Sequence, residues 1–440
     1  MSSFSVKRVS KVVLVLVVVA SLAAGGKLLY DDNLINGPLR AEASMLDQRR
    51  DAATKAGLPM KPEDIDTQER MKGLALHSDF MKFQDYLTGS PEVVEILSDE
   101  TRADEAAAML LQNDEQINNL LAASKLGNVN TPIDWEGGLL GREPTYVSYN
   151  RYVQAACAIA NYHFQQGDKG AALEFITASA DLTTQLTDEP TWKAMSSWAS
   201  CSSRIVRTAF QFVKDSPNDS AFAAGIAAAL NKINPPTDLT QVVRGDSLRF
   251  VMTARNWEKM SYDEKMDLQL QLQENKVEPP TGGQASKALE SKSLWFWVEA
   301  MKTASSEDAN VFDVGVAIDN IGGVWLINED ESSYLARSFG ITYEQTAMGI
   351  MRVVQIKNLA MTALEVLEHW HADRKLPDQI AGDKPIHRDP LTGKPLHYVK
   401  NGNEFFLLIL GNRTKETALA PVADLRPVLG QGPALTLSVG

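Results

Sequence analysis

The sequence predicts a mainly α-helical protein with one N-terminal transmembrane helix, a helical-hairpin body and a small β-hairpin near the C-terminus. Three observations support this fold class. Residues 12–30 form an almost continuous apolar run, residues 149–186 place apolar side chains at helical spacing, and Asn401-Gly402 separates two short strand-like runs. We therefore expect a body that is helical everywhere except close to its C-terminal end.

The first thirty residues are typical of a segment that directs a chain to a membrane. Basic residues precede the apolar run and acidic residues follow it: Lys7, Arg8, Lys11, Asp31 and Asp32. A helix over 12–30 would span roughly 28 Å, close to the thickness of a hydrocarbon core. The positive-inside rule then places the N-terminus in the cytoplasm and the body outside it, on the periplasmic side.

A cleaved secretory signal is the alternative for this segment. Ser21-Leu22-Ala23 offers a small-x-small cleavage site. The apolar run is longer than the h-region of an ordinary signal peptide, which favours an uncleaved signal anchor. No cysteine follows the run, so lipoprotein processing is excluded.

Changes in composition divide the chain into segments. A connector rich in Gly, Pro and Asn spans 128–144, and a polar linker spans 278–292. The expected organisation is a cytoplasmic N-terminus (1–11), a transmembrane signal anchor (12–30), a helical region (31–142), a helical-hairpin domain (143–292), a helical region ending in a long helix (293–371), and a Pro-rich loop with β-hairpin and tail (372–440).

The overall charge restricts the classes of partner. The chain has a formal net charge of −13 at pH 7. Affinity for phosphate backbones or anionic membrane surfaces requires clustered Lys and Arg. We therefore expect no nucleic-acid partner, and a membrane contact only through the N-terminal helix. The remaining expected partners are one or more proteins.

The two cysteines, Cys157 and Cys201, exclude a disulfide-dense scaffold. One bridge between them is compatible with an oxidising compartment. The alternative is two buried thiols in Ala-rich helices, because free cysteine is among the most buried residue types.

The region 149–186 contains the clearest helical hairpin. Apolar and small side chains lie on one face of each helix, with QQGDKG between them: Tyr149, Val153, Ala156, Ala160 and Phe164, then Ala172, Phe175, Ile176, Ser179, Leu182 and Leu186. With Gly167 at the turn and Ala172 in the second helix, the pattern resembles one tetratricopeptide repeat, although no second copy follows at the 34-residue period. The resemblance implies a helical body with a groove that binds a partner.

The C-terminal region carries a more specific pattern. Asp389, Pro390, Gly393, Pro395 and Tyr398 lie in DPLTGKPLHYV, which follows a long predicted helix. This ending resembles the C-terminal part of the major pseudopilins of type II secretion. Together with the apolar N-terminal segment, it is also similar to a group of uncharacterised membrane-anchored helical envelope proteins of planctomycetes and related bacteria. The resemblance implies a structural role for the five residues, within a helix, loop and hairpin.

Two departures from the pseudopilin pattern limit what the resemblance implies. The apolar run lacks the glutamate that a pilin-type subunit needs near the start of its mature helix. The loop Asn412-Arg413-Thr414-Lys415 replaces a calcium-binding loop and contains no carboxylate. We therefore expect neither pilin-type processing nor a calcium site.

Two further sequence patterns were candidates for chemistry. A polar cluster ends the long helix: Glu365, Glu368, His369, His371 and Asp373. Glu365 and His369 are spaced to share a metal, but a third ligand is not identifiable, so we expect a solvated helix end. Arg244-Gly245-Asp246 matches an adhesion tripeptide, although such short motifs arise often by chance.

We therefore predict no catalytic, cofactor-binding or metal-binding residue and no cofactor. The leading functional hypothesis is a non-enzymatic scaffold or protein-interaction protein of the bacterial envelope. Two alternatives remain at this point: an envelope hydrolase whose site is not visible in sequence, and an accessory component of a secretion or pilus-like system.

Overall fold

The computed structural model describes residues 37–141, 146–236, 238–270, 279–307, 309–327, 340–380, 382–409 and 434–439. The predicted cytoplasmic N-terminus and the signal anchor lie outside these residues. Among the helices that are described, none combines the length and apolar character needed to cross a membrane.

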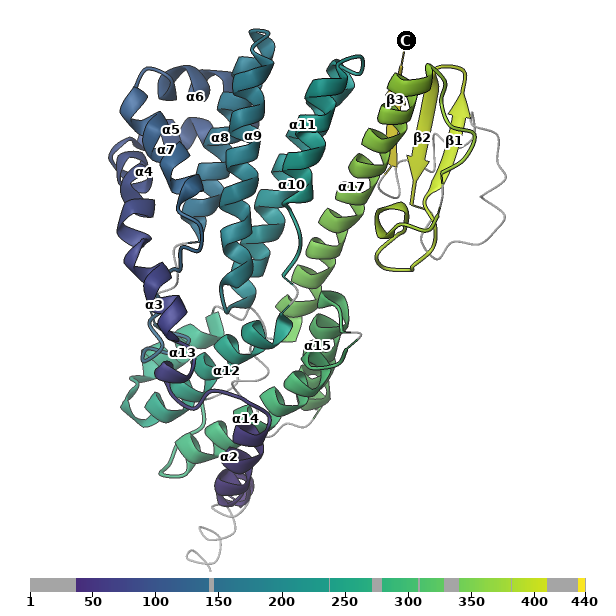
Figure 1. Ribbon diagram of the computed structural model, residues 1–440. Coiled ribbons are helices and arrows are strands. Elements are labelled where there is room, and N and C mark those ends of the chain that lie inside the picture. Colours follow the sequence, from purple (N-terminus) through teal and green to yellow (C-terminus); the bar gives the residue numbers. More distant parts are fainter. Residues whose placement is uncertain are drawn as a thin grey trace, which may run out of the picture.

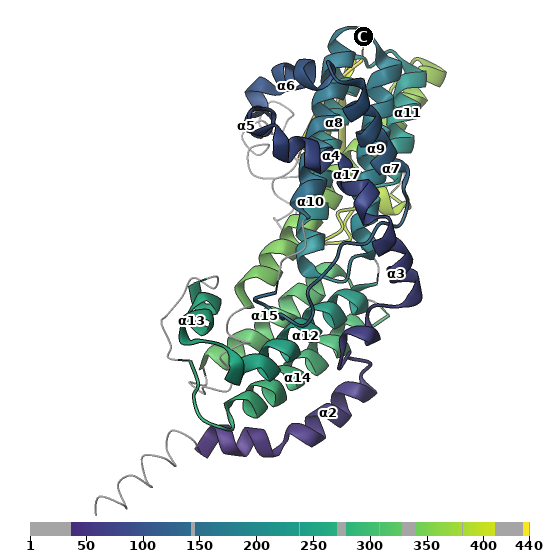
Figure 2. The same ribbon diagram turned by 90° about the vertical axis from the view of Figure 1, so that its left-hand side faces the viewer.

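The described chain is mainly helical, as predicted, and Figures 1 and 2 show the arrangement of its helices. The α-helices in chain order are α2 (Leu46–Lys55), α3 (Gln68–Ala75), α4 (His77–Gly89), α5 (Pro91–Ser98), α6 (Ala103–Leu110), α7 (Asp114–Lys125), α8 (Val147–Gln165), α9 (Lys169–Thr184), α10 (Trp192–Asp215), α11 (Ser220–Asn231), α12 (Leu239–Asn256), α13 (Tyr262–Leu270), α14 (Ala285–Ala304), α15 (Val311–Ile327) and α17 (Gly340–Asp373). Short 3-10 helices include η3 (Gln185–Asp188) and η6 (Pro385–His387). The three strands are β1 (His397–Asn401), β2 (Glu404–Leu408) and β3 (Ala434–Ser438).

Polar N-cap residues determine where several central helices begin. Asp168 accepts a hydrogen bond from the Ala171 N–H (3.0 Å) at the start of α9. Thr191 accepts one from the Ala194 N–H (3.2 Å) at the start of α10. Each cap satisfies a backbone donor that has no partner within its own helix, so the helix starts at a defined residue.

The predicted helical hairpin is formed by α8 and α9, which lie antiparallel beside α10 (Figure 1). Ala156, Ala160 and Ala172 are fully buried, and their small side chains allow close approach of the backbones. Gly167 makes the turn with a φ of +84°, a conformation that other residues adopt only at a cost. Close to this turn, the Phe164 and Phe212 rings stack with centroids 4.4 Å apart.

A second group of helices, α2, α12, α14 and α15, lies at the other end of the molecule (Figure 2). Glu290 of α14 holds this group together with two arginines. It accepts hydrogen bonds from Arg50 of α2 (2.9 and 3.1 Å) and from Arg255 of α12 (2.8 and 2.9 Å). The Glu290 side chain is 3% exposed, so the two arginines, rather than water, stabilise its negative charge.

Helix α17 connects the two groups. Its 34 residues extend for about 50 Å at 1.5 Å per residue. It packs on α15 near its start, on α10 and α11 along its middle, and on β2 and β3 near its end (Figure 1). Buried apolar side chains from α2 to β3 consequently form one continuous cluster.

The C-terminal sheet confirms the predicted hairpin and corrects the prediction for the tail. Strands β1 and β2 pair antiparallel around Gly402, which has a φ of +61°. The sequence predicted only a tail after the hairpin, but residues 434–438 form β3, antiparallel to β2. Leu435, Leu437 and Val439 alternate on the buried face, so hydrophobic burial explains the third strand.

The contacts of Glu290 with Arg50 and Arg255 lead to a prediction about stability. Replacement of Glu290 with Gln leaves Arg50 and Arg255 without a counter-charge at a buried site. Because both arginines are partly exposed, we expect a loss of about 2–3 kcal/mol, less than the roughly 3–5 kcal/mol that breaking a fully buried ion pair costs. The free energy of unfolding is measured by urea titration.

Glu299→Gln is the matched control, because Glu299 lies on the same helix in an exposed pair with Lys302. It should change the unfolding free energy by less than about 1 kcal/mol. Equal losses in the two variants would contradict the role given to Glu290.

Candidate functional site

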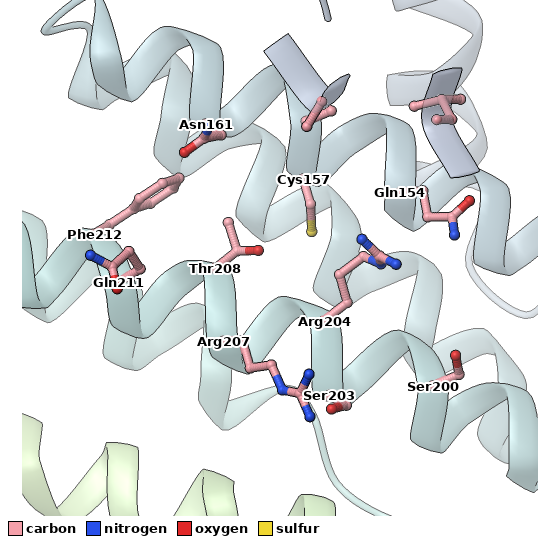
Figure 3. A pocket seen from close by; sticks show the side chains of 13 residues that line it. Gln154, Cys157, Asn161, Ser200, Ser203, Arg204, Arg207, Thr208, Gln211 and Phe212 are labelled. Atoms are coloured by element: carbon pink, nitrogen blue, oxygen red, sulfur yellow. The ribbon is translucent and has the colours of Figure 1, made fainter. Parts of the chain in front are cut away.

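A pocket of about 460 Å³ opens between α8 and α10, with α5 and α6 at its rim (Figure 3). Eight of its thirteen lining residues have polar or charged side chains, apart from Cys157. The lining residues are Leu97, Ala103, Gln154, Cys157, Ala158, Asn161, Ser200, Ser203, Arg204, Arg207, Thr208, Gln211 and Phe212.

The amphipathic pattern of α10 explains why polar groups meet at this place. Trp198, Ile205 and Phe212 are buried in the core. The polar residues of α10 recur three or four positions apart on the opposite face: Ser196, Ser200, Ser203, Arg207 and Gln211. Because this face also meets the polar side of α8, the pocket lies between two helices that supply amides, hydroxyls and cations.

The charge of the pocket is opposite to that of the whole chain. Arg204 and Arg207 both line it, whereas none of the described lining residues is Asp or Glu. Figure 3 shows the Arg204 guanidinium between α10 and α8, near Cys157 and Gln154, whereas Arg207 points away from α8. A chain with a net charge of −13 thus presents a local cationic site.

The thiol beside this pocket is not an activated nucleophile. Burial raises the pKa of Cys157, and the hydrogen bond with Ser179 and the nearby Arg204 guanidinium only partly oppose that shift. A neutral thiol is a weak nucleophile. The described lining residues contain no histidine or carboxylate to act as a general base. What this group of residues can do is bind an anion, through charge-assisted hydrogen bonds from arginine, hydroxyl and amide groups.

A second polar region lies around Arg70, and its charged groups already serve the fold. The Arg70 Nη1 atom lies 3.1 Å from Glu189 Oε2, and the Tyr146 hydroxyl donates to the same oxygen (3.2 Å). Glu189 also accepts a hydrogen bond from the backbone N–H of Thr131 in the connector. Burial raises the pKa of Glu189, while Arg70 and the Thr131 N–H oppose that rise. The network fixes the connector against α8 and η3.

A pocket of about 370 Å³ beside Arg70 is lined by three carboxylates, of Glu69, Asp188 and Asp238. Asp238 caps α12 by accepting a hydrogen bond from the Thr240 N–H (3.1 Å). The pKa of Asp188 is raised, chiefly by burial and also by the charge of Glu69. No group of three His, Cys, Asp or Glu residues in the described part of the chain is arranged to hold a metal ion.

The two cysteines are free and buried in the structure, so no bridge joins them. The Cys157 Sγ lies 3.8 Å from Ser179 Oγ, and the Cys201 thiol donates to Asn150 Oδ1 (3.1 Å). Of the two alternatives drawn from the sequence, this is the arrangement with two buried thiols.

The pseudopilin-like residues lie together in the loop that docks on α17. The Asp389 carboxylate accepts hydrogen bonds from Gln355 Nε2 (2.8 Å), the Leu391 N–H (3.1 Å) and the Thr392 hydroxyl (2.7 Å). It therefore closes the turn that contains Pro390 and Gly393 and attaches that turn to the helix.

The pseudopilin-like residues Gly393, Pro395 and Tyr398 stabilise the same loop. Gly393 has a φ of +66°. Pro395 forms an isolated bridge with Arg388, and the Tyr398 hydroxyl donates to the Pro377 carbonyl (3.0 Å). The expected calcium-loop replacement, residues 412–415, lies outside the described residues.

The cluster at the end of α17 is only partly the solvated helix end that we expected. His369 and Asp373 are well exposed and form a 3.4 Å pair. Glu365 differs from this prediction, because its carboxylate contacts the loop that docks on α17 instead of facing only solvent. It lies 2.7 Å from His387 Nε2 and 2.9 Å from Lys384 Nζ. His387 could not be identified from the cluster, since it lies 22 residues further along the chain.

The Arg244-Gly245-Asp246 tripeptide is part of the interior. The Asp246 Oδ2 accepts hydrogen bonds from the Trp192 N–H and the Tyr343 hydroxyl, each 3.2 Å long. Gly245 packs so closely that an added Cβ would lie 1.6 Å from the Pro190 carbonyl oxygen. These contacts give the tripeptide a structural role.

Comparison with known proteins gives no match for this chain to a family model, to a curated protein or to a solved structure.

Sequence reasoning did not identify the pocket between α8 and α10. One signal was present, the succession of polar residues at 200, 203, 204, 207 and 211 within a single helix. A solvated face has the same pattern, and only the position of α8 makes this face the wall of a pocket.

The buried Asp246 carboxyl group leads to a prediction of how the free energy of unfolding depends on pH. Burial raises its pKa to about 6. Between pH about 4 and 6 the folded state therefore binds more protons than the unfolded chain, and this contribution to stability is lost as the pH rises through 6. The stability lost between pH 5 and pH 7.5 amounts to about 1 kcal/mol.

Urea unfolding of the wild type and of Asp246→Asn at pH 5 and 7.5 checks this prediction. Asparagine does not titrate, so the difference in unfolding free energy between the two proteins should change by about 1 kcal/mol across this range. A difference that stays constant with pH would contradict the assignment.

Proposed function

We propose that the protein is a membrane-anchored scaffold or interaction protein of the bacterial envelope, and that its extracytoplasmic body binds an acidic group of a partner in the pocket between α8 and α10. The anchor and the compartment in this proposal come from the charge pattern of residues 1–32.

One observation supports the binding role most strongly. Arg204 and Arg207 line a pocket with hydroxyl and amide neighbours, and the described lining contains no carboxylate, although acidic residues outnumber basic residues in the chain by 56 to 43. Salt limits the reach of exposed charges to about 8–10 Å. Two acidic side chains lie next to the lining, because Asp104 accepts a hydrogen bond from Asn161 (3.0 Å) and Asp215 accepts one from Gln211 (2.9 Å). Acidic residues farther away are screened and do not cancel the attraction of the lining for an anion.

Binding without catalysis is the function best matched by these side chains. Arginine presents a planar set of donors that fits a carboxylate in a bidentate manner. Ser200, Ser203 and Thr208 add hydroxyl groups that can donate to the same anion. An envelope hydrolase would require a general base or an activated nucleophile, and the neutral Cys157 thiol supplies neither.

An accessory role in a secretion or pilus-like system is the second candidate. Its support is the C-terminal region, in which α17 packs on a small antiparallel sheet and Asp389 ties the intervening loop to the helix. The sequence of that region resembles the major pseudopilins in the same residues. This candidate is compatible with the binding role, because the anion pocket lies on α8 and α10, away from the sheet.

The binding role is tested with the full-length chain in neutral detergent micelles. Fluorescence anisotropy measures binding of fluorescein-labelled hexaglutamate, with labelled hexaglutamine as the uncharged control. We expect hexaglutamate to bind more tightly, and Arg204→Gln and Arg207→Gln each to weaken binding about tenfold, since a hydrogen bond to a charged group contributes about 1.5–3 kcal/mol.

Lys214→Gln is the matched control, because this exposed residue of α10 lies beyond the pocket and its replacement removes the same charge. It should change the dissociation constant less than about twofold, as expected for a screened charge at a distance. Equal binding of the two peptides, or equal effects of the Lys214 and Arg207 variants, would rule out the pocket as the site.

A further inference from the structure

We infer that the ligand is an extended acidic peptide segment that crosses α10 and occupies two pockets at once, with a third arginine, Arg352, holding its far end. This inference rests on the proposed binding function and adds the class and length of the ligand.

A second pocket, of about 450 Å³, lies between α10 and α17. Its lining residues are Ser196, Ala199, Ser200, Ser203, Arg207, Gln345, Thr346, Gly349, Arg352, Val353 and Ile356. Ser200, Ser203 and Arg207 line both pockets. The two pockets therefore adjoin along one stretch of α10, and we call them together the α10 trough.

The charge of the second pocket matches that of the first. Arg207 and Arg352 line it, and no Asp or Glu occurs among its described lining residues. Both arginines are exposed, and within the described part of the chain neither forms an ion pair. The trough thus presents cationic groups in both halves, which favours a ligand with more than one negative charge.

The length of the trough indicates an extended segment. Along α10 its lining runs from Ser196 to Phe212, which is roughly 24 Å at 1.5 Å per residue. An extended peptide rises about 3.3 Å per residue, so about seven residues would span it. A single small anion would occupy only one of the two pockets.

The chemistry of the walls favours a peptide over other polyanions. Amide side chains line both halves: Gln154, Asn161 and Gln211 in the first and Gln345 in the second. The Asn161 and Gln211 amide nitrogens donate to Asp104 (3.0 Å) and Asp215 (2.9 Å). An amide can both donate and accept, so Gln154 and Gln345 can pair with the N–H and C=O groups of an extended backbone. Ala199, Val353 and Ile356 give the second pocket an apolar part that suits a peptide side chain.

Two labelled peptides test this inference in the full-length chain. The octapeptide Glu-Glu-Gly-Ser-Gly-Ser-Glu-Glu can reach both pockets, and the tetrapeptide Glu-Glu-Gly-Ser can reach only one. We expect the octapeptide to bind at least tenfold more tightly. Arg352→Gln should weaken the octapeptide about tenfold and leave the tetrapeptide within about twofold, whereas Arg204→Gln should weaken both.

The outcomes separate this inference from the proposed function. If Arg204→Gln weakens both peptides but Arg352→Gln weakens neither, the first pocket binds anions and the two-pocket inference is overturned. If neither peptide responds to Arg204→Gln, the proposed function itself fails. Binding of vesicles with one-third phosphatidylglycerol, without binding of the octapeptide, would also overturn a peptide ligand. Lys214→Gln again controls for the loss of one positive charge from α10.

Discussion

The packing of α17 against both halves of the molecule is the constraint on which the rest of the structure depends. This single helix contacts α15 at one end, α10 and α11 along its middle and the C-terminal sheet at the other end. It supplies one wall of the α10 trough and the surface on which the loop before β1 docks. The relative positions of binding surface and sheet therefore follow from one continuous helix.

Polar residues on α17 decide how its neighbours dock. Gln355, Asn358, Thr362 and Glu365 recur along one face of the helix and bind groups of the loop 385–392. A different face carries Lys357, whose Nζ donates to the Ile233 carbonyl (2.5 Å) and to Asn234 Oδ1 (2.9 Å) just after α11. Burial lowers the pKa of Lys357 to about 8. Such buried polar groups are costly if unpaired, and so they favour one arrangement of the helices over alternatives of similar apolar burial.

The sequence was most informative where local pattern determines structure. The α8–α9 hairpin, the long helix near the C-terminus and the β1–β2 hairpin follow from helical spacing, a turn glycine and an Asn-Gly dipeptide. The third strand was missed, although Leu435, Leu437 and Val439 alternate as in a strand, because its pairing with β2 is a contact between distant residues.

The candidate site was less predictable for the same reason. His387 reaches Glu365 only because the loop folds back on α17. Arg207 and Arg352 line one pocket although they are 145 positions apart in the chain. No pattern within a single helix identifies such a pair, since an exposed arginine on a helix is ordinarily a solvated side chain.

Arginine footprinting of the full-length chain measures the occupancy of the α10 trough most directly. The protein is treated with phenylglyoxal with and without the Glu-Glu-Gly-Ser-Gly-Ser-Glu-Glu peptide, and the modified arginines are located by mass spectrometry. Occupancy of both pockets by the peptide predicts protection of Arg207 and Arg352 together, with no change at the exposed Arg374. Equal protection of all three arginines, or none at Arg207 and Arg352 when the peptide is bound, would contradict this occupancy.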